Sequence, residues 1–120
     1  MILNVGTDLE QIAPFQQRCL KTSFMNGVYT DQERDYIAAK ACPAETAAGI
    51  YCAKEAAAKA LGRGLFGLKP KELEIVYDAN GAPQLQLHGS ALEQYGNLRF
   101  SLSISHSRDF AMAVCVAFQE

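Results

Sequence analysis

The sequence lacks the features that mark several large classes of protein. No apolar run reaches the roughly eighteen residues that a membrane-spanning helix requires, and the longest, from Phe110 to Phe118, has the length of a buried strand. The opening residues, MILNVGTDLE, do not combine a basic segment with a following apolar one, as a signal peptide does. We therefore expect a cytoplasmic protein that neither crosses nor binds a membrane.

Cysteine spacing and net charge exclude further classes. The four cysteines show no CxxC spacing and no partnered histidines, so a metal site built on cysteine is not expected. Cys52 and Cys115 stand among apolar residues and are predicted to be buried, reduced thiols, which suits the cytoplasm. The net charge of −2 argues against general binding of nucleic acid. Positive charge is nevertheless concentrated between Lys54 and Lys71, either as a solvated face or as an anion site.

The chain is predicted to form one α+β domain over residues 1–120. Its 120 residues have an ordinary globular composition, 49% apolar and 20% charged, with no repeat and no linker that would divide them. Strands, then helices, then a run of strands favour this class over a doubly wound fold. We expect a small antiparallel sheet packed against a long central helix.

The stretch from Ala47 to Gly62 predicts that central helix. Its alanines have high helix propensity, Pro43 suits a first helical turn, and Gly62 is placed to end the helix. On this helix Tyr51, Glu55 and Lys59 are spaced by four and therefore share one face. A carboxylate and an ammonium one turn apart can serve a metal and a phosphate, but Glu55 and Lys59 also fit an ordinary exposed ion pair.

Apolar alternation and turn residues predict the remaining elements. In the first strand Ile2, Leu3 and Val5 are expected to be buried, and Gly6 to mark either a close backbone approach or a bulge. His88 is expected to be an exposed surface residue. A capping box at Thr30 predicts a helix that ends at Ala39, Asn80-Gly81 predicts a hairpin turn, and a helix begins near Pro14. The predicted strands are Ile2–Leu9, Leu73–Tyr77, Pro83–Leu87, Leu98–Ser105 and a more fully buried Ala111–Phe118, with a helical turn at Gly89–Tyr95.

Two further stretches carry residues with chemistry. Asp8 and Glu10 project to the same face of the first strand, where two neighbouring carboxylates repel each other unless a cation lies between them. Mg²⁺ suits such a site because it binds oxygen, keeps several waters and needs only one or two protein carboxylates. Near the end of the chain, Ser103-Ile104-Ser105-His106-Ser107 places imidazole and hydroxyl donors at the end of a strand, where they can bind a phosphate oxygen. Each stretch also has a plainer interpretation, as surface charges and as a turn bonded to its own backbone.

Taken together, these three stretches resemble a known family. G-x-D-x-E near the N-terminus, K-E-A-x-x-K-A in the middle and S-x-S-H near the end occur in the order and spacing of the holo-acyl-carrier-protein synthase family, the short bacterial-type 4′-phosphopantetheinyl transferases. The resemblance extends from Ile2 to Ala113. It implies an enzyme that transfers 4′-phosphopantetheine from coenzyme A to a serine of an acyl carrier protein and releases adenosine 3′,5′-bisphosphate.

The resemblance also implies roles for individual residues. Asp8 and Glu55 would hold Mg²⁺ with the coenzyme A pyrophosphate, Glu10 is a possible third metal ligand, and Lys59 would face the same pyrophosphate. Coenzyme A phosphates would also be contacted by Ser105, His106 and Arg63. The family is usually a homotrimer with active sites between subunits, so we expect His106 to serve the metal site of a neighbouring subunit.

Some matters stay open at this stage. The family often has an arginine just after the first motif for docking the carrier protein, whereas this chain has Pro14, with Arg18 and Lys21 further on. The carrier, from fatty-acid or from secondary metabolism, and the general base are not identified. The alternatives to the transferase are a non-catalytic oligomeric module that binds coenzyme A or another nucleotide, and a metal-dependent phosphohydrolase.

Overall fold

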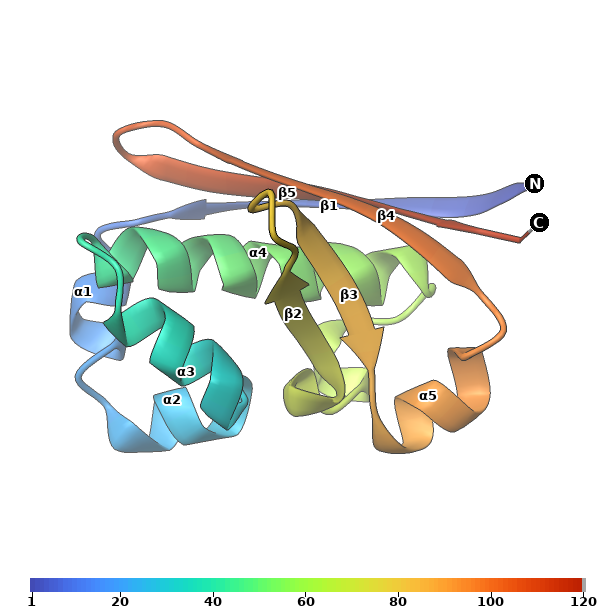
Figure 1. Cartoon of the computed structure of the whole chain (residues 1–120), viewed down its shortest axis with the longest axis horizontal. Coiled ribbons are helices and arrows are strands. Elements are labelled where there is room, and N and C mark those ends of the chain that lie inside the picture. The colour runs from blue at the N-terminus through green and yellow to red at the C-terminus, as the bar shows by residue number, and fades with distance from the viewer. Residues whose placement is uncertain (120) are drawn as a thin grey trace.

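A three-stranded antiparallel sheet covers one side of a long helix, and shorter helices and a two-stranded hairpin cover the other side (Figure 1). This is the expected α+β arrangement, and it is seen in a computed structural model that describes residues 1–119, without the side chain of Phe66. Among the described residues, no helix combines the length and the apolar character needed to cross a membrane.

The central helix, α4, spans Pro43–Ala60. It begins at Pro43, as expected of a proline that suits the first helical turn, where a missing N–H costs no hydrogen bond. It ends as predicted, since Gly62 takes a φ of +74° just beyond it. Most of its alanines are buried, so their small side chains allow other elements to pack closely around the helix.

The sheet lies on α4 in the order β1–β5–β4, with β1 at Ile2–Gln11, β4 at Arg99–His106 and β5 at Phe110–Phe118. On β5 the side chains that face α4 are all small and buried. Small residues on both surfaces bring the sheet and the helix close together. The predicted burial of Cys52 and Cys115 is confirmed. The small residues of β5 that face α4 are Ala111, Ala113, Cys115 and Ala117.

The closest approach between β1 and α4 occurs at Gly6. A Cβ atom at this position would lie 2.0 Å from the carbonyl oxygen of Ala56 and 2.7 Å from the amide nitrogen of Ala60. Real Cβ atoms do not come so near to backbone atoms. The prediction that Gly6 marks a close backbone approach is therefore confirmed, and it fixes β1 against the C-terminal half of α4.

No element of residues 1–119 covers the other face of the sheet (Figure 1). This face carries large apolar side chains. The expectation that Ile2, Leu3 and Val5 are buried is wrong, because Leu3 and Val5 point away from α4 and Ile2 lies before a shift in the strand register. The prediction that β5 is more fully buried than β4 is confirmed, although Phe110 and Met112 on its outer face are exposed. We call this surface the outer sheet face and define it by Leu3, Val5, Leu9, Phe110 and Met112.

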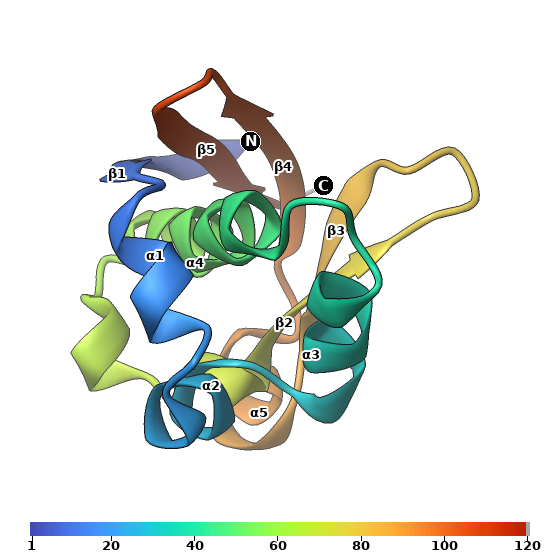
Figure 2. The same ribbon diagram turned by 90° about the vertical axis from the view of Figure 1, so that its left-hand side faces the viewer.

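The remaining elements cover the opposite side of α4, as the view along this helix shows (Figure 2). The predicted hairpin is formed by β2 and β3, with Gly81 at a φ of +81° in its turn. The capping box at Thr30 is also confirmed. The bounds are α1 Pro14–Arg18, α2 Thr22–Val28, α3 Asp31–Ala38, η1 Leu65–Gly67, η2 Pro70–Glu72, β2 Leu73–Tyr77, β3 Pro83–Leu87 and α5 Gly89–Tyr95.

Two ionisable residues are more buried than expected. His88 is half-buried rather than simply exposed, and its Nε2 lies 2.9 Å from Oε1 of Glu74. Lys54 is fully buried, so it does not belong to a positively charged surface between residues 54 and 71. In both cases the partners come from elements distant in the sequence, which local patterns do not identify.

Candidate active site

The interface between β1 and α4 brings Asp8 and Lys59 together. Because side chains alternate along a strand, Asp8 and Glu10 turn toward α4 while Thr7 and Leu9 turn away. Nζ of Lys59 lies 3.7 Å from Oδ1 of Asp8 and donates a hydrogen bond of 2.9 Å to the carbonyl of Thr7. Asp8 is mostly buried, with 12% of its side chain exposed, whereas half of the Lys59 side chain remains in solvent.

Glu55 belongs to the same group of charges. Burial raises the pKa of Glu55, and the negative charge of Asp8 raises it further. A hydrogen bond from the Tyr51 hydroxyl and the charge of Lys59 oppose this rise in pKa. The ring of Tyr51 packs edge-on against Phe15, with 5.5 Å between ring centroids, so the hydroxyl beside Glu55 is held by the aromatic core under α4.

Glu10 is the third carboxylate of this group. Burial raises its pKa to about 7, and a hydrogen bond with Asp8 and the charges of Asp8 and Glu55 act in the same direction. The guanidinium of Arg18, on α1, opposes them. Without a bound cation, the negative charge of the three carboxylates exceeds the positive charge around them, and Glu10 is therefore only partly ionised at neutral pH.

One oxygen of this group has no partner. Oδ2 of Asp8 is buried and accepts no hydrogen bond, a situation that costs about 1–3 kcal/mol. Residues 1–119 contain no cluster of three or more His, Cys, Asp or Glu side chains arranged to hold a metal by themselves. Mg²⁺ does not need such a cluster, because one or two carboxylates suffice when substrate phosphates and water complete its shell. The oxygen donors of Asp8 and Glu55 fit a Mg²⁺ ion of this kind.

The structure does not bring His106 and Ser105 to these carboxylates within one chain. His106 ends β4, and its Nε2 lies 3.3 Å from Oε1 of Glu45 in the first turn of α4. Ten residues separate Glu45 from Glu55, or about 15 Å along a helix. Glu10 is nearer, because His106 and Glu10 both pair with Ala111, but this residue of β5 lies between them. His106 and Ser105 instead line a cavity of about 320 Å³ beside the outer sheet face, together with Leu9, Ser107, Phe110, Ala111 and Met112.

Arg63 lies in the loop that follows α4, one turn beyond Lys59. Its guanidinium donates hydrogen bonds to the carbonyl of Gly67 at 2.5 Å and to the hydroxyl of Tyr95 at 3.5 Å. With Lys69 it lines a cavity of about 400 Å³ between this loop and α5. Within one chain, the predicted site residues thus form three separate groups. Asp8, Glu10, Glu55 and Lys59 form the first, Ser105 and His106 the second, and Arg63 the third.

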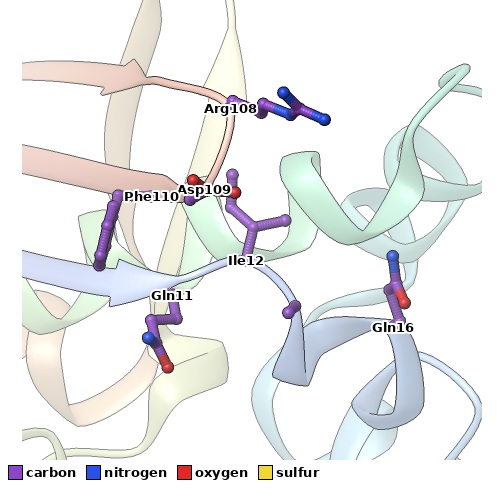
Figure 3. Close-up of a pocket in the computed structure, with 7 residues that line it drawn as sticks. Gln11, Ile12, Gln16, Arg108, Asp109 and Phe110 are labelled. Carbon is purple, nitrogen blue, oxygen red and sulfur yellow. The ribbon is translucent and has the colours of Figure 1, made fainter.

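A further cavity, of about 410 Å³, lies just beyond Glu10, where β1 leads into α1 and faces the β4–β5 turn (Figure 3). Gln11, Gln16 and Arg108 are among its lining residues, and none of the predicted site residues lines it. Sequence reasoning gave no role beside the carboxylates to Tyr51 or Arg18. The spacing of four residues between Tyr51 and Glu55 on a helix could have indicated their contact. No short sequence pattern indicates that Arg18 lies near Glu10.

Comparison with known proteins identifies the family to which this geometry corresponds. Residues 4–115 match the model of the 4′-phosphopantetheinyl transferase superfamily. The holo-[acyl-carrier-protein] synthase of Caldicellulosiruptor saccharolyticus is 40% identical over 124 aligned residues, which cover 100% of this chain and 99% of that protein.

Solved structures agree with this match. The holo-[acyl-carrier-protein] synthase of Neisseria meningitidis superposes with a TM-score of 0.87 at 30% identity, covering 99% of this chain and 100% of the other. The synthase of Bacillus anthracis, in a complex described as containing CoA (3′,5′-ADP), gives a TM-score of 0.84 at 28% identity, covering 100% and 99%.

Proposed function

The chain belongs to the 4′-phosphopantetheinyl transferase superfamily and is an enzyme, and on this premise we propose that it transfers 4′-phosphopantetheine from coenzyme A to a serine hydroxyl of an acyl carrier protein. The products are the holo-carrier protein and adenosine 3′,5′-bisphosphate. The observation that carries this proposal is the unpartnered, buried Oδ2 of Asp8, surrounded by Glu55, Glu10 and Lys59.

In this proposal Asp8 and Glu55 hold Mg²⁺, with Glu10 as a possible third ligand. When bound, Mg²⁺ would neutralise part of the negative charge on the diphosphate. Lys59 adds a second positive charge at the same place, because its ammonium is anchored on the Thr7 carbonyl and half of its side chain reaches solvent. Developing charge on the bisphosphate leaving group is thereby stabilised.

Glu10 has two possible tasks at this site, and both require its ionised form. It either completes the metal shell or accepts the proton that the attacking serine hydroxyl loses. Its pKa of about 7 keeps both protonation states populated at neutral pH. A nearby cation favours the carboxylate, so binding of Mg²⁺ would shift Glu10 toward the form that either task needs.

We further propose a homotrimer with active sites between its subunits. Exposed apolar residues on the outer sheet face support self-association, because contiguous patches of this kind mark interaction sites. Ser105 pairs with Met112 of this face, and His106 is separated from Glu10 of its own chain by Ala111 of β5. A neighbouring copy would bring them to the carboxylates, where they and Arg63 would contact coenzyme A phosphates. The four free cysteines suit the cytoplasmic location that we propose.

The proposed reaction is tested by incubating the protein with apo-carrier protein, coenzyme A and Mg²⁺, with mass spectrometry of the carrier as the readout. The carrier should gain one phosphopantetheine adduct, and chelation of Mg²⁺ should abolish the gain. Asp8→Asn should lower the rate about 100-fold or more, because a charge-stabilising ligand is lost. Glu93→Gln is the matched control, since Glu93 is an exposed carboxylate on α5.

Three results would contradict the proposal. Coenzyme A binding without an adduct on any carrier would indicate the non-catalytic module. Hydrolysis of coenzyme A in the absence of carrier would indicate the phosphohydrolase. Equal rates for the Asp8 variant and the wild type would remove the metal assignment.

A further inference from the structure

A fully buried ion pair lies directly behind the candidate active site. Lys54, the residue before Glu55 on α4, places its Nζ 2.8 Å from Oε1 of Glu33, and neither side chain has any exposed surface. The same ammonium donates to the carbonyl of Pro70 at 2.7 Å and to that of Leu73 at 3.0 Å. Three acceptors match the three N–H groups of a lysine ammonium, so no donor is left unpaired.

Glu33 is satisfied just as completely. Its Oε1 also accepts from the amide of Thr30 at 2.9 Å, and its Oε2 accepts from the amide of Ile75 at 2.7 Å. The hydroxyl of Thr30 continues the network to Glu74, whose other oxygen lies 2.9 Å from His88. The network therefore joins α3, β2 and the start of α5 to the middle of α4.

Stability alone does not explain this arrangement. Replacing a buried ion pair by apolar residues of similar volume is often neutral or stabilising, because two charges must be removed from water. In agreement, burial lowers the pKa of Lys54, and the Glu33 carboxylate opposes that effect. The particular property of Lys54 is that two of its three hydrogen bonds go to backbone carbonyls at η2 and the start of β2.

Those carbonyls close a loop that starts at the end of α4. The loop, residues 61–69, begins directly after Lys59 and Ala60, and it carries Arg63 and Lys69 beside the cavity described above. Its beginning is tied to α4 because the amide of Arg63 donates to the carbonyl of Ala58. Its far end is tied to the same helix by Lys54.

We propose that Lys54 is a positioning residue, which holds Pro70 and Leu73 against α4 and thereby fixes loop 61–69 in the conformation that presents Arg63 and Lys69 to the cavity beside α5. The consequence for coenzyme A affinity rests on the proposed function. The effect on the loop conformation does not.

The test uses the double variant Glu33→Gln/Lys54→Met, which removes both buried charges and leaves no unpaired one. Hydrogen exchange should accelerate at the amides of Gly67, Leu68 and Glu72, which bond within or next to the loop, by about 10-fold or more, as expected for local opening. KM for coenzyme A should rise about 10-fold, while kcat and KM for the carrier change by less than about twofold.

The matched control is Tyr29→Phe. It removes another buried hydrogen bond to α4, from the Tyr29 hydroxyl to the carbonyl of Ala47 at 2.7 Å, and leaves in place the bonds from Lys54 to Pro70 and Leu73. It should lower the melting temperature but leave both loop exchange and KM for coenzyme A unchanged. If the double variant does not fold, Lys54→Gln is measured in the same way.

Unchanged loop exchange in the Lys54 variants would overturn the proposal, and so would an equal rise in KM in Tyr29→Phe. A wild-type protein that transfers nothing would instead refute the proposed function, and hydrogen exchange would still decide the role of Lys54.

Discussion

The chemistry of the candidate site depends on an imbalance between a few side chains. Asp8, Glu10 and Glu55 act on one another at the β1–α4 interface, whereas Lys59 and Arg18 are the cations beside them. Raised pKa values and an unpartnered carboxylate oxygen are costs in the metal-free protein. Such costs are characteristic of sites that are completed by a ligand, and they make stability depend on pH.

The first prediction concerns Glu10 and the pH dependence of stability. Its pKa rises from 4.5 to about 7 on folding, so the folded protein binds this proton more tightly than the unfolded chain. The free energy of unfolding of the metal-free protein should therefore fall between about pH 4.5 and pH 7 and stay low above that. At pH 8, Glu10→Gln should raise the free energy of unfolding by about 1 kcal/mol, after allowance for screening at this partly exposed site. The melting temperature should rise by about 4 °C.

Calorimetry in the presence of a chelator, at pH 4 and at pH 8, measures this effect. The gain should be absent at pH 4, where Glu10 is protonated in both states. A gain of equal size at both pH values would show that the charge of Glu10 is not its cause.

At the scale of elements, the fit between β1 and α4 decides whether the site exists. Gly6 allows the strand to reach the helix backbone, and two residues later Asp8 meets Lys59. Alanines on α4 and on β5 give the same closeness across the rest of the sheet. The site is therefore a product of small residues that carry no chemistry themselves.

The second prediction is that Gly6→Ala damages both stability and function. The added methyl group would clash with the backbone of Ala56 and Ala60 and force β1 away from α4. We expect a loss of about 2 kcal/mol or more in the free energy of unfolding, as for other overpacked interiors. A shift of Asp8 by about 1 Å should also lower turnover by about 100-fold.

Urea denaturation and the carrier assay give these two values. Gly27→Ala is the control, because a Cβ at Gly27 meets nothing within 4 Å. It should leave turnover unchanged and stabilise α2 slightly. If Gly6→Ala behaves like this control, the close approach does not position Asp8.

For the whole molecule, the two faces of the sheet have opposite characters. The face against α4 is built from small, buried residues, and the outer sheet face exposes Leu9 by 64% and Val5 by 54%. His106, at the end of β4, contacts Glu45 on the α4 side and also lines a cavity with Leu9 and Met112 of the outer sheet face. In the proposed trimer, each chain therefore gives its carboxylates to one active site and its His106 to another. Each site would be complete only after assembly.

The third prediction is that Leu9→Glu prevents self-association and abolishes transfer, because a buried, unpaired carboxylate would oppose contact between copies. Sedimentation velocity reports the assembly state, and the carrier assay reports transfer. Leu92→Glu is the control, since Leu92 is an exposed leucine on α5, outside the outer sheet face. Dissociation by both variants, or by neither, would argue against an interface at this face.

A fourth prediction follows from the division of residues between sites. His106→Ala and Asp8→Asn should each be inactive alone, and a mixture should regain part of the activity once subunits exchange. Exchange is confirmed by mass spectrometry of mixed oligomers labelled with different isotopes. A mixture that exchanges and stays inactive would place both residues in the site of one subunit.

Much of the local structure follows from the sequence itself. The helix ending before Gly62, the capping box at Thr30 and the hairpin at Asn80-Gly81 depend on contacts within a few residues, so short patterns predict them. The pairing of Asp8 and Glu10 on one face follows from the period of a strand. The family also follows, because three motifs occur in a fixed order. A single domain over residues 1–120 and the roles of the individual site residues stay predictions.

Only the tertiary structure decided which surfaces are covered. The alternation of β1 shows that Leu3 and Val5 share a face, but burial of that face depends on whether another element packs on it, and α4 packs on the other. Lys54 and His88 meet Glu33 and Glu74 through contacts between distant segments. Periodicity is a property of neighbouring residues, whereas burial and the pairing of charges are set by the whole fold.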